Sequence, residues 1–339
     1  MAQQWRYLLP SILSILFVLI SIYYHFSLIF VVLLLANFLN WKWGEFSSQE
    51  LSETLKYFYS SRNARIIKTI NALILFGFIF WSITFVDRSN FSLIELIFFT
   101  VSIGIFTGCF IITLGHDLLH SRSFFHRALS TVLFTISGIP HFATEHICGH
   151  HREVGLKEDP TTALQNESFY TYFFKITYSN FRDIWIYQFG LPGYMKRKIL
   201  VSNIGMLVFL FSVWFCIYYF SNHSGSTLAF FIGQGLISYL MYQLINYIQH
   251  YGLLRSHKNA PITQNLAWNC YYKYTNYILF LLPLHSLHHL THKDCKIEQL
   301  KDGPRMPYLY FLMILLALIP PLWFHKMNKL LKSQNLVAS

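Results

Sequence analysis

The sequence predicts an all-α integral membrane protein with about six transmembrane helices and a cytoplasmic, histidine-rich cap of helix ends and loops. Three observations support this. Of the 339 residues, 54% are hydrophobic and only 12% are charged, whereas soluble domains average about 25% charged residues. Apolar runs long enough to cross a bilayer recur along the chain. Nine of the 16 histidines fall into four short motifs that this topology would place on one side.

Each predicted span is an apolar run of about 20 residues, the length at which a helix crosses the hydrocarbon core. The N-terminal run is long for one helix and short for two, so a single tilted helix is the alternative to two short spans there. With two spans at the N-terminus, the six predicted helices cover about 7–24, 26–40, 66–86, 91–115, 199–220 and 226–248.

The last apolar run, at 307–324, is predicted to be re-entrant or interfacial rather than a further span. Two prolines interrupt it and three lysines follow it, namely Pro320, Pro321, Lys326, Lys329 and Lys332. A full crossing would put these lysines on the outside, against the positive-inside rule. The polar stretches are too short and too scattered to form a separate domain, so the whole chain, 1–339, is expected to be one domain.

The net charge of +11 is concentrated in three long stretches between the apolar runs, at 41–65, 116–198 and 249–307. With alternating spans all three lie on one side, which the positive-inside rule makes the cytoplasm. The charge therefore needs no nucleic-acid partner, and no basic helix or aromatic-basic repeat occurs. We expect a multi-pass protein of a bacterial inner membrane, in contact with lipid, with its active site facing the cytoplasm.

The four histidine motifs are "HDLLH" (116–120), "EHICGHH" (145–151), "NYIQHYG" (246–252) and "HSLHH" (285–289). Residues at i, i+3 and i+4 share a helix face, so a motif of this kind can aim two imidazoles at one metal. The adjacent His151 and His289 point about 100° away and could serve a second metal. Nine histidine ligands are more than one metal ion with an open coordination position can use. The candidate ligands are His116, His120, His146, His150, His151, His250, His285, His288 and His289.

Imidazole suits zinc, copper, iron and nickel. The five cysteines form no CxxC pair, which argues against an iron–sulfur cluster or structural zinc. A zinc protease is one alternative, because "HDLLH" has the outline of HExxH with Asp117 in place of the glutamate base. A metal transporter is another, but transporters place polar groups near the bilayer midplane, where only Glu95 and Gln234 stand out. Two metals beside a bilayer favour oxygen activation on apolar chains.

These motifs resemble those of the integral-membrane alkane 1-monooxygenases (alkane omega-hydroxylases) and the xylene monooxygenase hydroxylase subunits. Both belong to the histidine-box superfamily of membrane fatty acid desaturases and hydroxylases. The four motifs occur in family order, and "GHHREVGLKEDPTTALQNESFY" (149–170) resembles the family's stretch after its second box. "NYIQHYGL" (246–253) discriminates best, because it separates alkane hydroxylase-like proteins from acyl desaturases. The resemblance runs from about residue 90 to the C-terminal apolar run.

The resemblance implies that the nine histidines bind two non-haem iron ions. It implies O₂-dependent hydroxylation of the terminal carbon of an alkane or alkyl chain that enters from the bilayer. The two electrons would come from a rubredoxin- or ferredoxin-type carrier with its NAD(P)H reductase, and the basic face would suit an acidic carrier. Fatty acyl desaturation or hydroxylation and xylene-type methyl oxidation are the alternatives. No catalytic side chain is expected beyond the metal centre.

Three positions depart from the family pattern. Asp117 stands where the family usually has Glu, and Leu284 stands where alkane hydroxylases have Arg before the first histidine of the last box. Leu287 replaces an Asp that would support an imidazole. We expect these departures to affect the choice of substrate more than the binding of metal. Residues expected to orient the ligands, with a salt bridge, a helix cap or plain packing as the alternative role, are Asp117, His141, Glu145, Glu153, Glu158 and Asp159.

Overall fold

The computed structural model describes residues 4–24, 38–182, 192–290 and 303–333. This part of the chain contains helices and no named strand; its only strand-like pairings are two isolated β-bridges, Glu45 with Tyr272 and Asn269 with Arg305. The predicted all-α class is confirmed.

Among the described residues, four helical segments are long and apolar enough to cross a membrane. They match the four strongest predicted spans. They are α4 (Arg62–Arg88), the continuous segment from α5 (Leu93–Phe106) through the π-helical turn η2 (Thr107–Ile111) into α6 (Ile112–Leu119), α11 (Gly193–Phe220), and α12 (Ser224–His250).

The predicted count of six spans is not confirmed. The short 3₁₀ helix η1 (Gln4–Leu8) leads into α1 (Leu9–Tyr24), whose 16 residues fall short of the other candidates. Most of the predicted span at 26–40 lies outside the described residues. The run at 307–324 forms two short helices, α15 (Tyr310–Ala317) and α16 (Pro320–Ser333), which meet near the two prolines. Neither is long enough to cross, so no straight span forms there.

Polar residues lie at the two short connections between long helices, α4–α5 and α11–α12, and explain why the helices end there. Ser92 and Glu95 form a capping box at the start of α5, which accounts for the one acidic residue in that predicted span. At the end of α4, Asp87 accepts a hydrogen bond from the backbone N–H of His223, at 2.9 Å. This bond ties the α4–α5 connection to the α11–α12 connection, so the two lie at the same end of the bundle.

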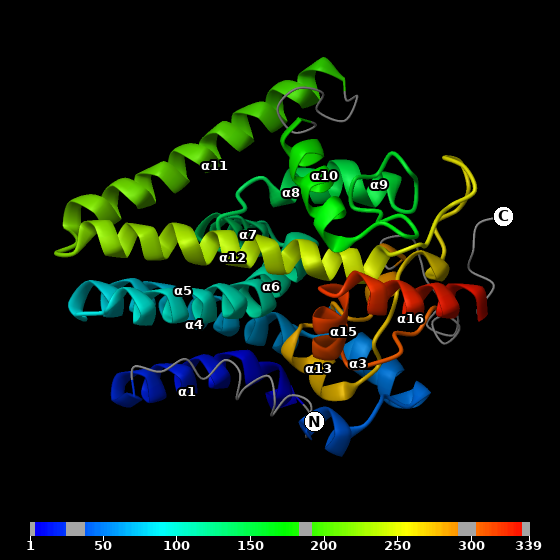
Figure 1. Ribbon diagram of the computed structural model, residues 1–339, viewed down its shortest axis with the longest axis horizontal. Coiled ribbons are helices and arrows are strands. Elements are labelled where there is room, and N and C mark those ends of the chain that lie inside the picture. The colour runs from blue at the N-terminus through cyan, green and yellow to red at the C-terminus, as the bar shows by residue number, and fades with distance from the viewer. Residues whose placement is uncertain (1–3, 25–37, 183–191, 291–302, 334–339) are drawn as a thin grey trace.

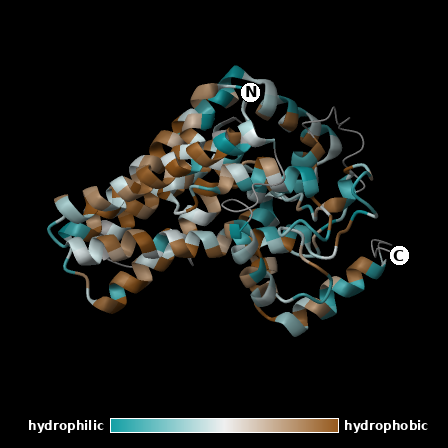
Figure 2. Ribbon diagram, turned by 90° about the horizontal axis from the view of Figure 1, so that it is seen from above, coloured by the Kyte–Doolittle hydropathy of each residue, from teal (hydrophilic) through white to brown (hydrophobic). Residues whose placement is uncertain are grey.

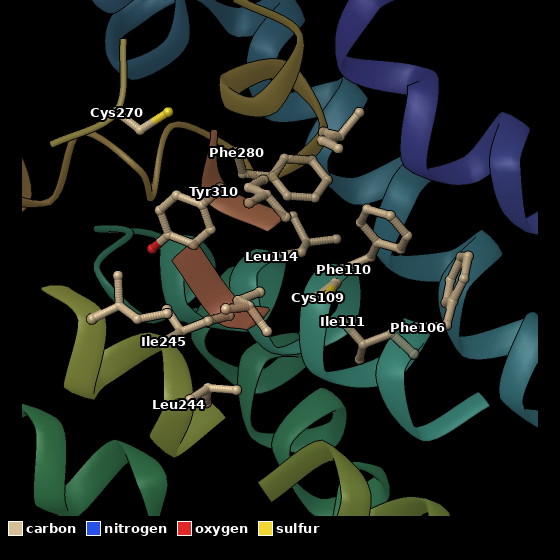
Figure 3. Close-up of a cluster of buried hydrophobic side chains, with 14 of the residues drawn as sticks. Phe106, Cys109, Phe110, Ile111, Leu114, Leu244, Ile245, Cys270, Phe280 and Tyr310 are labelled. Atoms are coloured by element: carbon tan, nitrogen blue, oxygen red, sulfur yellow. The ribbon is translucent and has the colours of Figure 1, made fainter. Parts of the chain in front are cut away.

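Helix α12 packs along α5 and η2 through small residues. A Cβ added at Gly104 would lie 2.5 Å from the Cβ of Ile237, and one at Gly108 would lie 2.6 Å from the Cβ of Met241. Larger residues would therefore push the two helices apart. The close packing holds the ends of α6 and α12 next to each other (Figure 1). Figure 3 shows the buried aromatic and aliphatic side chains around this contact, including Phe106, Phe110 and Leu244.

Most of the shorter helices gather around the histidine-bearing ends of α6 and α12, whereas α1 lies beside the long helices (Figure 1). Figure 2 shows that this end is richer in hydrophilic residues than the bundle of long helices. Three long polar stretches predicted to share one side thus meet at one end. The helices concerned are α3 (Ser48–Ser60), α8 (Phe142–Thr144), the π-helical η3 (Glu145–His150), α9 (His151–Glu153), α10 (Phe169–Arg182), η6 (Gln264–Leu266), α13 (Lys273–Ile278), α14 (His285–Leu290), α15 and α16. The helix α7 (Phe124–Ile136) packs against α6.

Candidate metal centre

All nine predicted histidines lie together at this end of the bundle. Eight of them form two groups of four, and within each group one ligand atom from every residue lies within 4.8 Å of the others. We call His116, His120, His146 and His288 the first group, and His150, His250, His285 and His289 the second group. The last turn of α6, the π-helical η3, the last residue of α12 and α14 supply them.

Helix periodicity explains part of this division. His116 on α6 and His120 at its C-cap, four residues apart, share the first group, and His285 and His289, four apart on α14, share the second. The prediction that His289 would be the one to leave for a second metal is wrong, because His289 stays with His285 and His288 joins the first group instead. The last motif therefore contributes to both groups.

The second motif behaves differently from the prediction, because it forms a π-helix rather than an α-helix. His146 and His150 do not share a group. His151 was expected to point toward a second metal, yet its Nε2 lies 2.9 Å from that of His146 and 2.8 Å from that of His288, both in the first group. A π-helix bonds residues five apart, which brings positions i and i+5 to similar sides. His151 therefore borders the first group as a fifth imidazole.

The ring nitrogens are spaced as ligands of one ion are spaced. In the first group, the Nε2 atoms of His116 and His146 are 2.8 Å apart. In the second, the Nε2 atom of His285 lies 3.0 Å from that of His250 and 3.1 Å from that of His289. Two nitrogens bound at right angles, each about 2.1 Å from a metal, would be about 3.0 Å apart. The geometry thus suits one ion in each group.

Burial keeps these imidazoles in the form that binds metal. Burial, followed by the mutual repulsion of neighbouring histidines, lowers the pKa of His146, His285, His288 and His289 well below the ordinary value. At neutral pH they are uncharged, and a neutral imidazole offers a lone pair to a metal.

Two imidazoles of the second group are held by groups behind them. The Nδ1 of His150 lies 3.0 Å from Oδ2 of Asp159, and both side chains are at most 2% exposed. The Nδ1 of His250 donates to the carbonyl oxygen of Leu266, also at 3.0 Å. Each contact occupies Nδ1 and leaves Nε2 for a metal. Burial alone would raise the pKa of Asp159, but the contacts with His150 and Thr162 outweigh it and lower that pKa.

The other predicted supporting residues have different surroundings. Asp117 pairs with Lys68 at 2.9 Å, and Glu153 pairs with Arg152 at 2.7 Å. Burial lowers the pKa of His141 to about 4, and its ring packs edge-on against Tyr239. Within the described residues, none of these three makes a hydrogen bond to the nine histidines. Glu158 borders a surface cleft of 450 Å³ beside Glu153.

Glu145 is 3% exposed, and neither of its carboxylate oxygens has a hydrogen-bond partner at good geometry among the described residues. Burial, and then the charge of Asp159, raise its pKa to about 8. It is held mostly as the neutral acid at neutral pH, next to His146 in sequence but not bonded to it.

Sequence reasoning overlooked Lys68. It lies on α4 with its Nζ 3.6 Å from the ring centroid of Phe58, and it pairs with Asp117 between the two α6 histidines. A lysine inside an otherwise apolar span is costly unless paired, and that was the available signal. Phe142, which stacks on His146 with ring centroids 5.0 Å apart, gave no such signal.

A large and a small cavity border the histidines in the described part of the chain. A chamber of 840 Å³ borders His116, His120 and His288 of the first group, and its walls include Lys68, Asp117, Arg65, Arg122 and His126. A much smaller cavity of about 20 Å³ borders His116, His146 and His285, with Ile112, Phe142 and Ile245 among its apolar walls. One side of the centre is therefore polar and open, and the other is apolar and confined.

Comparison with known proteins identifies relatives of the chain. The fatty acid desaturase family model matches residues 92–294. Alkane 1-monooxygenase 2 of Alcanivorax borkumensis is 29% identical over 71% of this chain and 65% of its own length, just under two thirds. Alkane 1-monooxygenase 1 of Pseudomonas aeruginosa is 26% identical over 89% of this chain and 81% of its own. The xylene/toluene monooxygenase hydroxylase component of Pseudomonas putida is 24% identical over 66% and 61%.

Proposed function

The chain belongs to the fatty acid desaturase family, and from that premise we propose that it is a non-haem di-iron monooxygenase that hydroxylates the terminal carbon of alkanes or alkyl chains. The balanced reaction takes one hydrocarbon, one O₂, two electrons and two protons to one alcohol and one water. Its relatives named as alkane 1-monooxygenases support the reaction class.

The observation that carries the proposal is the pair of four-histidine groups. Both contain no thiolate, and their imidazoles are buried apart from that of His120, which is half-buried. Nε2 of His150 is buried without a hydrogen-bond partner, as expected of an atom kept for a metal. Nitrogen-rich sites of this kind suit iron among other first-row metals. When iron is bound there, it supplies reductive activation of O₂ for oxidation of an unactivated C–H bond.

The chain's own residues would hold the metal ions, orient the imidazoles that bind them and shield the centre from water. Asp159 and the Leu266 carbonyl fix the imidazoles of His150 and His250 in one tautomer and one direction. Phe142 and Ile112 exclude water from the confined cavity beside His116 and His146. An alkyl chain would reach this cavity from the bilayer with its terminal carbon first, guided by shape because the walls are mostly apolar.

The polar chamber would serve the opposite side of the centre. Its opening beside His120 and His288 provides a route for protons and product water. An acidic rubredoxin- or ferredoxin-type carrier would dock on this basic end and deliver electrons from its NAD(P)H reductase. We place this end in the cytoplasm, in a bacterial inner membrane, because the lysines and arginines gather there.

The test is purification of the full chain, quantification of iron, and measurement of O₂-dependent alkanol formation with a rubredoxin and its reductase. We expect two irons per chain and an alcohol at the chain terminus. Active protein with fewer than two irons per chain contradicts the di-iron proposal. Metal analysis showing one zinc and no iron would favour the protease alternative.

Oxidation of an aromatic methyl group is the second candidate, favoured by similarity to the xylene/toluene monooxygenase component. Competition between octane and p-xylene in the same assay separates the two. Labelled fatty acids added in parallel test acyl desaturation or hydroxylation, which would yield a double bond or a mid-chain alcohol instead.

A further inference from the structure

The polar chamber beside the first group has a buried inner wall and an exposed opening. Its inner wall includes the buried side chains of Lys68, His116 and His126. Tyr59 and Ser60 end α3, Arg65 lies in the first turn of α4, and Arg122 lies in the connection between α6 and α7. These four are the exposed residues that border the chamber, and we call them the chamber mouth. Two arginines from segments far apart in the sequence therefore border one opening.

The two guanidinium groups at the chamber mouth have no partner of opposite charge. Among the described residues, the side chains of Arg65 and Arg122 make no ion pair and no hydrogen bond. The carboxylate in the chamber wall, that of Asp117, is already paired with Lys68 at 2.9 Å. Burial, followed by repulsion from Lys68, lowers the pKa of His126, so this imidazole is uncharged at neutral pH. The arginines therefore leave the mouth with uncompensated positive charge.

Two serine hydroxyls add neutral donors to the chamber. Ser60 of the mouth and Ser123 both border it, and within the described part of the chain neither hydroxyl makes a hydrogen bond. Ser123 is the N-cap residue of α7, yet its side chain does not cap that helix. Guanidinium groups bind the oxygens of phosphates and carboxylates through two parallel N–H groups, and hydroxyls can donate to the same oxygens. The mouth therefore suits an oxyanion.

The chamber mouth lies where the apolar surface of α4 begins. Exposed apolar side chains follow Arg65 at helical spacing, on one face of α4, namely Ile66, Ile70 and Leu73. At the start of α7, next to Arg122 in the chain, Phe124 is 79% exposed and Phe125 is 53% exposed. On a membrane protein such a face contacts acyl chains, and basic and aromatic residues at its end lie at the level of the lipid headgroups. An anion bound at the mouth is therefore at the depth of lipid phosphate.

We propose that the chamber mouth binds the phosphate of an anionic phospholipid between the guanidinium groups of Arg65 and Arg122. The acyl chains of this lipid lie along the exposed apolar face of α4. A zwitterionic lipid fits less well, because its ammonium group brings a further positive charge to a site that already has two. At 840 Å³ the chamber is much larger than the roughly 10–15 Å³ that one water molecule needs, so a headgroup at the mouth leaves room for water beside His120.

The test is binding of short-chain lipids to the full-length, iron-loaded protein in an uncharged detergent. The probes are dihexanoyl phosphatidylglycerol, dihexanoyl phosphatidylcholine and inorganic phosphate. Wild-type protein is expected to bind the phosphatidylglycerol roughly 20-fold more tightly than the phosphatidylcholine, because each basic residue beside an anionic headgroup contributes a preference of about fivefold. Inorganic phosphate at the same concentration should not displace the phosphatidylglycerol, since it has no acyl chains to bind the face of α4.

Substitution of the arginines separates this site from the general basic charge of the chain. Arg65→Gln and Arg122→Gln should each reduce the preference for phosphatidylglycerol about fivefold, and the double variant should abolish it. Arg62 provides the matched control, because it is also exposed on α4, one turn before Arg65, and does not border the chamber. Arg62→Gln should keep the wild-type preference. An equal loss in Arg62→Gln and Arg65→Gln would overturn the inference, since the attraction would then be spread over the surface.

Three further outcomes would also overturn it. The first is equal affinity of the wild type for the two lipids. The second is displacement of phosphatidylglycerol by equimolar inorganic phosphate, which would assign the mouth to a free anion. The third is an unchanged lipid preference in both arginine variants with a raised KM for the rubredoxin, which would assign it to the electron carrier. Thermal unfolding checks that each variant is folded, and methionine replaces glutamine in one that is not. Lipid binding needs no turnover, so its failure leaves the proposed hydroxylation untouched.

Discussion

The two groups of histidines adjoin one another but have different surroundings. The first borders a polar chamber of 840 Å³ through His116, His120 and His288. The second is covered by two loops that hydrogen-bond to each other. Gly252 N–H donates to the Ala163 carbonyl at 2.8 Å, and Arg255 N–H donates to the Gly155 carbonyl at 2.7 Å. None of its four imidazoles is more than 3% exposed.

The first group is the more accessible of the two, and the second is the more rigidly held. Behind the second group, Asp159 is nearly inaccessible and bonded also to the hydroxyl of Thr162, so the imidazole of His150 has little freedom. Beside the first group lies the buried pair of Lys68 and Asp117, at the wall of the chamber. We infer that the second group is built for retention of its metal and the first for exchange of protons and water with solvent.

Removal of one ligand from each group should have the largest effect. His289→Ala and His120→Ala should each abolish hydroxylation and reduce the bound iron from two per chain to one, because each group has its own ligands. Iron quantification and alkanol formation measure this. Loss of both irons from either variant would show that the groups do not bind independently.

Removal of the carboxylate behind His150 should affect the second group alone. Asp159→Asn is expected to lower metal affinity or activity by about 10–100-fold, the usual effect of losing a partner of a metal-bound imidazole. Metal titration of the variant checks this. Glu153→Gln is the control, because Glu153 pairs with Arg152 and not with an imidazole. Equal losses of metal affinity in the two variants would contradict a special role of Asp159.

Breaking the ion pair at the chamber wall should affect stability more than chemistry. Lys68→Met leaves the Asp117 carboxylate buried without its cation, and we expect a loss of about 3 kcal/mol in the free energy of unfolding. The double variant Lys68→Met, Asp117→Leu should recover most of it, since neither charge then remains. Denaturation in detergent measures both. Lys175→Met, which breaks a more exposed pair with Glu167, should cost less.

An ion pair away from both groups should have the smallest effect. Lys273 bonds Glu50 at 2.7 Å, and this contact, followed by the Ser47 backbone N–H, lowers the pKa of Glu50 below its ordinary value of 4.5. The stabilisation is present above pH 4.5 and is lost as the pH falls through the lowered pKa. Because Glu50 is a third exposed, Lys273→Met should cost only ~0.5 kcal/mol at neutral pH. The difference from wild type should vanish in acid, with iron content unchanged throughout.

The sequence by itself determined the all-α class, four of the spans and the positions of nine histidines at one end. These follow from local quantities. An apolar run of about 20 residues is stable as a helix in a bilayer wherever it occurs, and the alternation of spans then places the polar stretches. The spacing of His116 and His120 similarly predicts one shared face, whatever the rest of the chain does.

Only the tertiary structure decided how the histidines divide and what supports them. His146 meets His288 across 142 positions of sequence, and their Nε2 atoms lie 3.2 Å apart because α14 packs beside η3. The π-helical turn redirects His151, and no local spacing rule for an α-helix includes it. Asp159 was one of several equivalent acids until the loop fold placed it behind His150. Such contacts depend on packing between distant segments, whose distances a local pattern does not contain.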